Sequence, residues 1–342
     1  AISYVVAVAG SYTWHLALAV LVLYLSFFPP LVAGPVVRVD ELVPQFHERP
    51  DPRRVPATEA FVLVGVGLFK AVVVAGYLGT ELVDPAFAAP GSASGVALLV
   101  SAYAFAIQIY AGFSGATDIA IGCALLLGVR YPQAFDAPYR ALSVREFWRR
   151  WNLTLSHWLR DYLYVPLGGS RRGAAVAYRN VMITMVLGGL WYGAGWTFVV
   201  WGGLHGAYVV GERAASSWYA ARAPAGTAPA AVGAVLRWLL TFNLVCVAWV
   251  FFRADSVGTA FEIVGRIATV AAGSAGLVTG LVLLTIVAAL ASQLVADHRT
   301  LGWRARFSTL GPAAQAAVLA AGLTLVSVLG PDGGAPFGYF PF

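Results

Sequence analysis

The stretch that decides the fold is VMITMVLGGLWYGAGWTFVVWGGLHGAYVV, which occupies residues 181–210. Its thirty residues include no Asp, Glu, Lys or Arg, and a helix needs only about 20 residues to cross a bilayer. The glycine-rich run GGLWYGAG at 188–195 interrupts the stretch near its centre. Because non-helical backbone at membrane depth is tolerated only beside protein or a water-filled cavity, this break is predicted to line a site.

The rest of the chain has the composition of a membrane protein. Its 342 residues are 59% hydrophobic and 11% charged, whereas soluble domains are about 45–50% apolar and 25% charged. This excludes a soluble globular enzyme, a disordered chain and a nucleic-acid binder, and it predicts an all-α polytopic membrane protein. Cys123 and Cys246 lie in apolar runs without metal-ligand spacing, so neither a zinc site nor a disulfide framework is expected. The other candidate spans are residues 12–37, 59–82, 95–129, 234–252, 276–296 and 313–329.

Two of the apolar segments have lengths that do not match a single membrane crossing. The span 95–129 is too long for one straight crossing, and we expect a break at Gly112 and Gly115. The apolar run 1–10 is too short to cross a bilayer, so we interpret it as the tail of a span whose beginning is absent. The chain is therefore expected to be N-terminally truncated.

The arginines predict an orientation, because basic residues concentrate in cytoplasmic loops. One topology places 19 of the 21 arginines in the cytoplasm and leaves Arg253 and Arg266 outside. It requires both ends of 181–210 to lie on the cytoplasmic side, so this segment must be a hairpin with its tip near Trp191. The arginines assigned to the cytoplasm are Arg38, Arg49, Arg53, Arg54, Arg130, Arg140, Arg145, Arg149, Arg150, Arg160, Arg171, Arg172, Arg179, Arg213, Arg222, Arg237, Arg299, Arg304 and Arg306.

The long basic loop 130–180 contains an amphipathic pattern. A polar stripe recurs at helical spacing opposite an apolar one, which is typical of a helix lying in the membrane interface. Ser143 and Glu146 have the spacing of a capping box at its start. From this pattern alone we favour a membrane-surface anchor over a site. The polar stripe is Arg145, Arg149, Asn152, Ser156 and Arg160, and the apolar one is Trp148, Trp151, Leu155, Trp158 and Leu159.

A glycine- and arginine-rich run follows at 166–173. Free backbone N–H groups and arginines can cradle a phosphate, but the Lys-Ser/Thr ending of a P-loop is absent. A basic cytoplasmic turn is the favoured interpretation.

Three polar residues lie inside the apolar spans, where they are costly. Asp118 is interpreted as a buried tether between helices, with a cavity lining as the alternative. Lys70 either pairs with Asp118 or extends towards the interface. His205 is either a structural hydrogen-bonding group or a general base. Gly202 and Gly206 beside it have the spacing of close helix packing.

At this point the motifs resemble those of the membrane-bound O-acyltransferase (MBOAT) family, and most of all its alginate O-acetylation branch. The run FWRRWNLTLS at 147–156 and the run WLRDYLYVPLGG at 158–169 carry the resemblance, which extends over essentially the whole chain. The Pro-Leu-Gly-Gly loop resembles the polysaccharide-acetylating branch more than the D-alanyl-transferring one. Further matches, in order, are FFP at 27–29, AGP at 33–35, GLFK at 67–70, QIY at 108–110, FSG at 113–115, APYR at 137–140, GGLW at 188–191, WVFFRA at 249–254 and YFPF at 339–342.

The resemblance implies a fold and an activity. The fold is a single domain over 1–342, a ring of tilted transmembrane helices with broken segments and interfacial amphipathic helices. The activity is transfer of an acyl group, from acetyl-CoA or a similar cytoplasmic donor, through a tunnel to hydroxyls of an extracytoplasmic polysaccharide. No bound cofactor or metal is expected. The implied partners are membrane lipid and a secreted or membrane-anchored acetyltransferase, and the implied location is the bacterial inner membrane.

The resemblance also assigns site residues, with departures. Tyr192 stands where the family has its tunnel histidine, and Asn152 stands at the second polar position. A tyrosine has an ordinary pKa of about 10, which makes it a poor base at pH 7 but leaves it able to donate to an oxyanion. His205 is the nearest candidate for a substitute base. Gly112 stands at the position of a family aspartate. Substrate contacts are expected from Trp191, Arg160, Asp161 and Asp118.

Three functions remain open. In the first, the protein is an active O-acyltransferase with a substitute base. In the second, it is a degenerate homologue that acts as a scaffold or lipid-binding partner. In the third, it is a transporter whose broken helices bind a substrate at mid-membrane, although the paired broken segments typical of such folds are absent. We prefer the first.

Overall fold

The computed structural model describes residues 14–29, 34–47, 51, 53, 55–220, 231–295 and 307–330. The predicted N-terminal tail at 1–10, the ending at 339–342 and Arg49, Arg54, Arg222, Arg299, Arg304 and Arg306 lie outside them. The chain forms two compact units. The first combines Ala1–Val73, Ala111–Ala134 and Asp297–Phe342, and the second combines Val74–Tyr110 and Phe135–Ala296.

Five of the described helices are long and apolar enough to cross a membrane. They are Ala57–Ala88, Gly95–Leu126, Ala174–Tyr192, Gly233–Arg253 and Pro312–Leu329. Two predicted spans are wrong in extent. In the span 12–37 the described helix α2 (Trp14–Ser26) ends before Pro29, since proline cannot continue a helix. In the span 276–296 the helix α14 covers only Gly280–Ser292, which is too short for a bilayer core of about 30 Å.

The first unit packs α4 (Ala57–Leu68) against the second half of α7 (Gly95–Leu126) through glycines. A Cβ on Gly115 would lie 2.6 Å from the carbonyl oxygen of Gly67, and one on Gly122 would lie 2.7 Å from that of Ala60. The predicted break at Gly112 and Gly115 is therefore wrong, because α7 is one continuous helix. Its glycines let two backbones approach closely, which is their common use in membranes.

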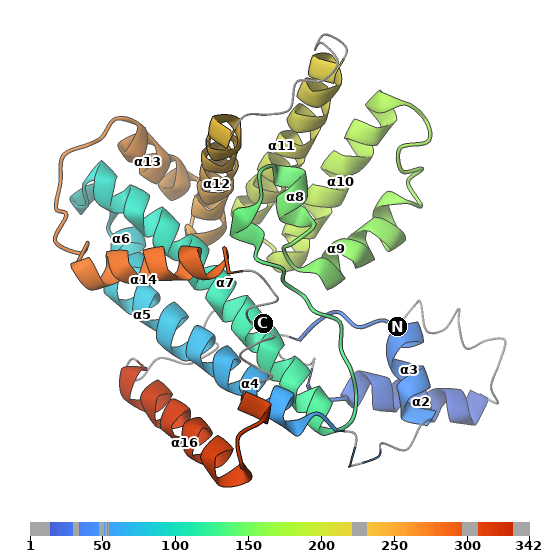
Figure 1. Ribbon diagram of the computed structural model, residues 1–342. Helices are drawn as coiled ribbons and strands as arrows, with labels where there is room; N and C mark the ends of the chain where they lie inside the picture. Colours follow the sequence, from blue (N-terminus) through green and yellow to red (C-terminus); the bar gives the residue numbers. More distant parts are fainter. Residues whose placement is uncertain are drawn as a thin grey trace. The chain divides into compact units, whose positions relative to one another are not determined.

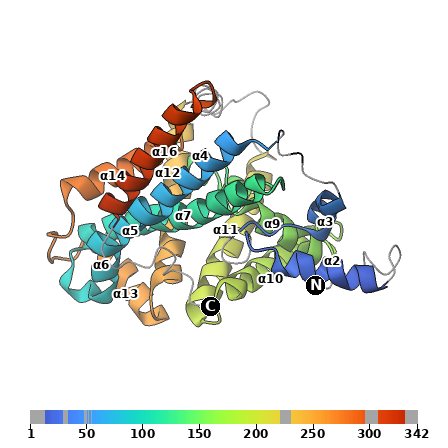
Figure 2. The same ribbon diagram turned by 90° about the horizontal axis from the view of Figure 1, so that it is seen from below.

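The remaining helices of the first unit are short or peripheral. Helix α3 (Val39–His47) packs beside α2, and Gln45 in it exchanges hydrogen bonds with the backbone of Arg130. Helix α16 (Pro312–Leu329) runs along α4 (Figure 2), and none of its residues is buried. Helix α16 therefore presents an apolar surface suited to lipid.

An ion pair crosses the glycine-lined contact of the first unit. The Lys70 ammonium lies 2.7 Å from the Asp118 carboxylate and donates a second hydrogen bond to Ser114 at 3.1 Å. Asp118 is only 8% exposed. The predicted pairing of Lys70 with Asp118 is confirmed, and the pair joins α7 to the π-helical turn Phe69–Val74 that continues α4.

We expect Asp118→Lys to lower the stability of the protein in detergent by about 1.5–3 kcal/mol, because it removes a charge-assisted hydrogen bond and places two ammonium groups together. The swapped double variant Lys70→Asp/Asp118→Lys should recover most of this loss. Thermal unfolding of the two proteins checks the pair. A double variant no more stable than Asp118→Lys alone would show that the pair does not stabilise the fold.

The second unit consists of helices joined by turns and loops, and its described residues pair in the manner of strands only at an isolated bridge between Ala93 and Ser274 (Figure 1). Its segments, listed in chain order, are α5 (Ala75–Leu78), the π-helical turn Gly79–Val83, α6 (Asp84–Ala88), the first half of α7, α8 (Val144–Trp148), α9 (Leu153–Leu159), the π-helical turn Arg160–Tyr164, α10 (Ala174–Tyr192), α11 (Trp196–Ala220), α12 (Ala231–Arg253), α13 (Val257–Ala268) and α14.

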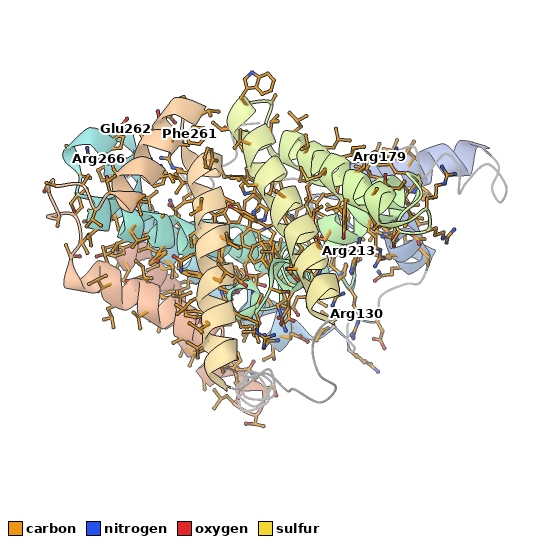
Figure 3. The ribbon with its side chains drawn as sticks, turned by 90° about the horizontal axis from the view of Figure 1, so that it is seen from above. Arg130, Arg179, Arg213, Phe261, Glu262 and Arg266 are labelled. Atoms are coloured by element: carbon orange, nitrogen blue, oxygen red, sulfur yellow. The ribbon has the colours of Figure 1, made fainter. Side chains whose placement is uncertain are left out.

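Helices α10 and α11 form the predicted hairpin. Added Cβ atoms at Gly189 and Gly202 would collide with the backbone carbonyls of Phe198 and Met185 respectively, so the two helices run antiparallel in close contact. The chain reverses at residues 193–195, and Arg179 and Arg213 lie towards the open end of the hairpin (Figure 3). The predicted break is confirmed, although α10 continues through Gly188 and Gly189 and ends only at Tyr192.

Adjacent glycines of α11 offer a matched test of this packing. We expect Gly202→Ala to destabilise the hairpin by about 1–3 kcal/mol, because the methyl group would meet the backbone of Met185, which cannot rotate away. Gly203→Ala adds the same methyl group where nothing lies within 4 Å and should have little effect. Thermal unfolding of both variants measures the difference. Equal losses would mean that the close approach is not a source of stability.

Candidate active site

The turn after α8 presents Asn152. Ser143 caps α8, since its hydroxyl accepts the Glu146 N–H at 3.1 Å, as the capping-box spacing predicts. The Glu146 carboxylate accepts the N–H of Leu142 at 2.9 Å, one residue before the position expected for a full box. The chain then leaves the helix and passes through Asn152, whose φ of 39° is left-handed, before α9 begins. Asparagine is among the few side chains that adopt this conformation readily.

The single amphipathic helix predicted across 145–160 is therefore wrong. It is interrupted at 149–152, and its apolar side chains Trp148, Trp151, Leu155 and Leu159 are buried in the second unit, while Trp158 stays exposed. Most of the apolar stripe is thus buried inside the protein. Tertiary packing of these side chains interrupts the helix that their spacing alone predicts.

The hairpin presents Tyr192 as the last residue of α10. Gly193 follows it, and any Cβ there would overlap the ring of Phe198. A larger residue immediately after Tyr192 would therefore require the Phe198 ring to move. The Tyr192 ring contacts Trp201 and Phe252 edge-on, at centroid distances of 5.4 Å and 5.7 Å.

The two polar positions meet. The side-chain amide of Asn152 donates a hydrogen bond to the Tyr192 hydroxyl oxygen at 2.9 Å, although 40 residues separate them in sequence. This bond occupies a lone pair of the Tyr192 oxygen and orients its O–H proton away from Asn152. Asn152 therefore orients the Tyr192 hydroxyl group. Both side chains are part-buried, which weakens the competition from water.

His205 has a different environment. It is fully buried, and the Trp148 indole N–H donates to its Nδ1 at 3.2 Å. An indole N–H can only donate, so Nδ1 is the unprotonated nitrogen and Nε2 carries the proton. Nε2 has no hydrogen-bond partner among the described residues. The lone pair that would accept a proton is already engaged, so His205 is arranged as a structural group.

An aromatic core surrounds these residues. Trp201 contacts His205 at a centroid distance of 4.9 Å as well as Tyr192, and it stacks on Trp249 at 5.5 Å and 25°. Phe147 stacks on His205 at 6.0 Å and 10°. Rigid aromatic packing of this kind fixes the position of Tyr192 from three helices, α10, α11 and α12.

The other predicted contacts are dispersed. Arg160 and Asp161 pair with each other at 2.6 Å, with Arg160 57% exposed. Trp191 is 56% exposed beside Tyr192. Asp118 belongs to the first unit and pairs with Lys70 there. Of the predicted site residues, the structure brings together Asn152 and Tyr192, with Trp191 beside them.

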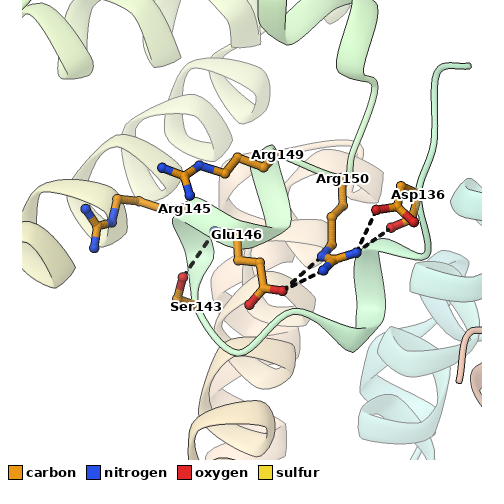
Figure 4. Close-up of a pocket in the computed structure, with 6 residues that line it drawn as sticks. All are labelled: Asp136, Ser143, Arg145, Glu146, Arg149 and Arg150. Atoms are coloured by element: carbon orange, nitrogen blue, oxygen red, sulfur yellow. Dashed lines mark hydrogen bonds and ion pairs between the residues drawn. The ribbon is translucent and has the colours of Figure 1, made fainter. Parts of the chain in front are cut away.

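A polar cavity of about 460 Å³ was not predicted (Figure 4). It lies beside α8 and the loops before and after that helix. Its lining residues are Asp136, Ser143, Arg145, Glu146, Arg149 and Arg150. Burial acts to raise the pKa of Glu146, but the N–H of Leu142 and the Arg150 guanidinium outweigh it, so this pKa is lowered. The polar stripe that includes Arg145 and Arg149 is the sequence signal for this cavity, but its pattern also fits a helix at a membrane surface, which is the prediction made above. No group of three metal-binding side chains occurs in the described part of the chain.

Comparison with known proteins identifies the family. Residues 12–252 match the model of the membrane-bound O-acyltransferase family, and this match does not extend to the last predicted motif at 339–342. A peptidoglycan O-acetyltransferase of Helicobacter pylori is 41% identical over 244 residues, which are 70% of this chain and 45% of the relative. A probable alginate O-acetylase of Azotobacter vinelandii is 42% identical over 239 residues, which are 70% of this chain and 46% of the relative.

A more distant relative is a teichoic acid D-alanyltransferase of Streptococcus thermophilus, 26% identical over 195 residues, which are 54% of this chain and 47% of the relative. The chain thus spans a little under half the length of each of these relatives. The family match covers well over half of the chain itself. Its apolar helices include a hairpin formed by α10 and α11. The chain is a polytopic, all-helical membrane protein that belongs to the membrane-bound O-acyltransferase family.

Proposed function

We propose that the protein transfers an acyl group from a cytoplasmic thioester donor, acetyl-CoA or a similar compound, to hydroxyls of an extracytoplasmic polysaccharide. The hydrogen bond between Asn152 and Tyr192 at the end of the hairpin carries the proposal. It joins the two positions that the family resemblance marks as polar. The names of the relatives, which act on peptidoglycan and alginate, support a polysaccharide acceptor.

The reaction is an acyl exchange. The acceptor hydroxyl oxygen attacks the thioester carbonyl, a C–O bond forms, the C–S bond breaks, and the hydroxyl proton ends on the thiolate sulfur. Negative charge develops on the carbonyl oxygen during the attack. The Tyr192 O–H, held by Asn152, donates to this oxygen and stabilises it. Tyr192 is therefore a hydrogen-bond donor in this mechanism, in place of the base implied by the family histidine.

A second candidate is a homologue without acyl transfer that acts as a scaffold or lipid-binding partner. It is favoured by the absence of a base in the described site: Tyr192 replaces the family histidine, and the Nδ1 lone pair of His205 accepts from Trp148.

The surroundings of the site are part of the proposal. We place the protein in the bacterial inner membrane as a multi-pass protein, with lipid around its apolar helices. A secreted or membrane-anchored acetyltransferase would complete the transfer outside the membrane.

The test is a transfer assay with the full-length protein in nanodiscs, radiolabelled acetyl-CoA and either alginate or peptidoglycan as acceptor. Label in the polymer that accumulates more slowly in Asn152→Ala than in the parent protein supports acyl transfer at this site. A silent parent protein that gains activity on Tyr192→His supports the degenerate homologue instead. Activity that is equal in the parent and in Asn152→Ala contradicts the proposed site.

A further inference from the structure

The arginines of the polar cavity differ in what they bind. Arg150 is fully engaged, with its guanidinium 2.7 Å from Asp136 and 2.9 Å from Glu146. Those two carboxylates are the acidic residues of the lining, and Arg150 together with Arg140, which lies 3.0 Å from Asp136, offsets their two charges. The remaining lining charge is positive and belongs to Arg145 and Arg149.

Arg145 and Arg149 have donors to spare. Arg145 donates its backbone N–H and its Nε to Glu212 at 3.1 Å and 2.8 Å, which fixes the side chain but leaves both terminal amino groups without a partner in the described residues. The Arg149 guanidinium is exposed and makes no hydrogen bond or ion pair to any residue that the structure describes. The two side chains extend to the same side of α8 (Figure 4).

This arrangement suits a phosphate group. Guanidinium groups present planar, paired donors that match phosphate oxygens. Arg145 offers such donors although Glu212 offsets its charge, and Arg149 adds a positive charge that no described carboxylate pairs with. The Ser143 hydroxyl, also in the lining, accepts from Glu146 and can donate its own proton to a ligand oxygen. A cavity of about 460 Å³ has room for a phosphate ester with part of its attached group.

The cavity and the candidate active site share one turn. Arg149 and Arg150 line the cavity, and Asn152, two residues further on, holds Tyr192. We propose that Arg145 and Arg149 bind phosphate of the acyl donor, so that the turn at 149–152 positions the donor relative to Tyr192. This inference rests on the proposed acyl transfer. A lipid headgroup carries the same chemistry, and the experiment separates the two sources.

The experiment measures equilibrium binding to the full-length protein in nanodiscs made only of neutral lipid. The probes are coenzyme A and pantetheine, which lacks phosphate. We expect Arg149→Ala to weaken coenzyme A binding roughly 10- to 100-fold, the range of a lost charge-assisted hydrogen bond, and to leave pantetheine binding unchanged. Arg149→Lys should recover only part of the loss, because an ammonium group lacks the paired donors.

The matched control is Arg171→Ala, which removes an exposed arginine outside the cavity lining. It should leave coenzyme A binding within about twofold of the parent protein, because Arg171 does not line the cavity and salt screens the longer-range effect of a surface charge. An equal loss in Arg149→Ala and Arg171→Ala would indicate a diffuse basic surface and overturn the site, as would an unchanged affinity in Arg149→Ala.

A second series replaces part of the neutral lipid with phosphatidylglycerol. Competition between this lipid and coenzyme A in the parent protein, with lipid retention lowered by Arg149→Ala, would assign the cavity to a lipid phosphate and overturn the donor assignment. An affinity for coenzyme A that does not depend on the lipid supports it. Because binding is measured without turnover, a protein that binds coenzyme A through Arg149 and transfers nothing would contradict the proposed function and not the phosphate site.

Discussion

Replacing Tyr192 by phenylalanine is expected to slow acyl transfer roughly 100- to 1,000-fold, the cost of removing one donor to a developing oxyanion. The ring remains, so its contacts with Trp201 and Phe252 persist and only the hydroxyl is lost. The hydroxyl is proposed to act in the transition state, so kcat should fall while the affinity for the donor stays constant. The measurement is the steady-state rate of acetyl transfer, with coenzyme A binding measured on the same samples.

Asn152→Ala is the companion variant, because Asn152 acts only through Tyr192. It should lower kcat less than Tyr192→Phe does, and the two changes together should cost little more than Tyr192→Phe alone. Independent, additive losses would show that the hydrogen bond does not couple the two residues in catalysis. Full activity in Tyr192→Phe would exclude the Tyr192 hydroxyl as the hydrogen-bond donor to the oxyanion. Another residue would then have to stabilise that charge.

The hairpin that presents Tyr192 could be predicted from local sequence signals, whereas the place of Asn152 in the site came from the family resemblance and its contact with Tyr192 from the structure. Glycines at 188–195 mark the break in an apolar stretch, and chain order with the arginine distribution requires a hairpin there. The structure confirms the hairpin by its glycine contacts. It adds the direction of the hydrogen bond, from the amide to the hydroxyl oxygen, which a sequence pattern does not contain.

Other features could not be predicted, since the same local pattern fits two packings. A glycine in a long apolar helix marks either a break or a close approach, and only the neighbouring Gly67 identifies Gly115 as a contact. The helical period through 145–160 likewise hides the left-handed residue Asn152, because burial of Trp151 outweighs the continuity of one helix. The cavity lining includes Arg145, whose side chain is held by Glu212, a residue 67 positions later in the sequence.

His205 provides the second large effect. We expect His205→Ala to destabilise the protein by about 3–5 kcal/mol, as for truncation of a buried aromatic ring. The change leaves a void among Phe147, Trp148 and Trp201 and removes the acceptor of the Trp148 N–H. Thermal unfolding in detergent measures this loss. His205→Gln retains a side-chain acceptor for Trp148 and should recover a substantial part of the stability.

The pH dependence of transfer separates this structural role from catalysis. A general base at His205 would give a rate that falls on the acid side as the ring becomes protonated, and His205→Gln would abolish both that limb and most of the activity. The geometry predicts the opposite result. With Nδ1 accepting from Trp148, His205→Gln should keep kcat within about tenfold of the parent and leave the shape of the pH profile unchanged, because no proton passes through the ring. Loss of the acid limb in His205→Gln, in a protein that still unfolds cooperatively, would make His205 the substitute base and would require the Trp148 hydrogen bond to open during each turnover.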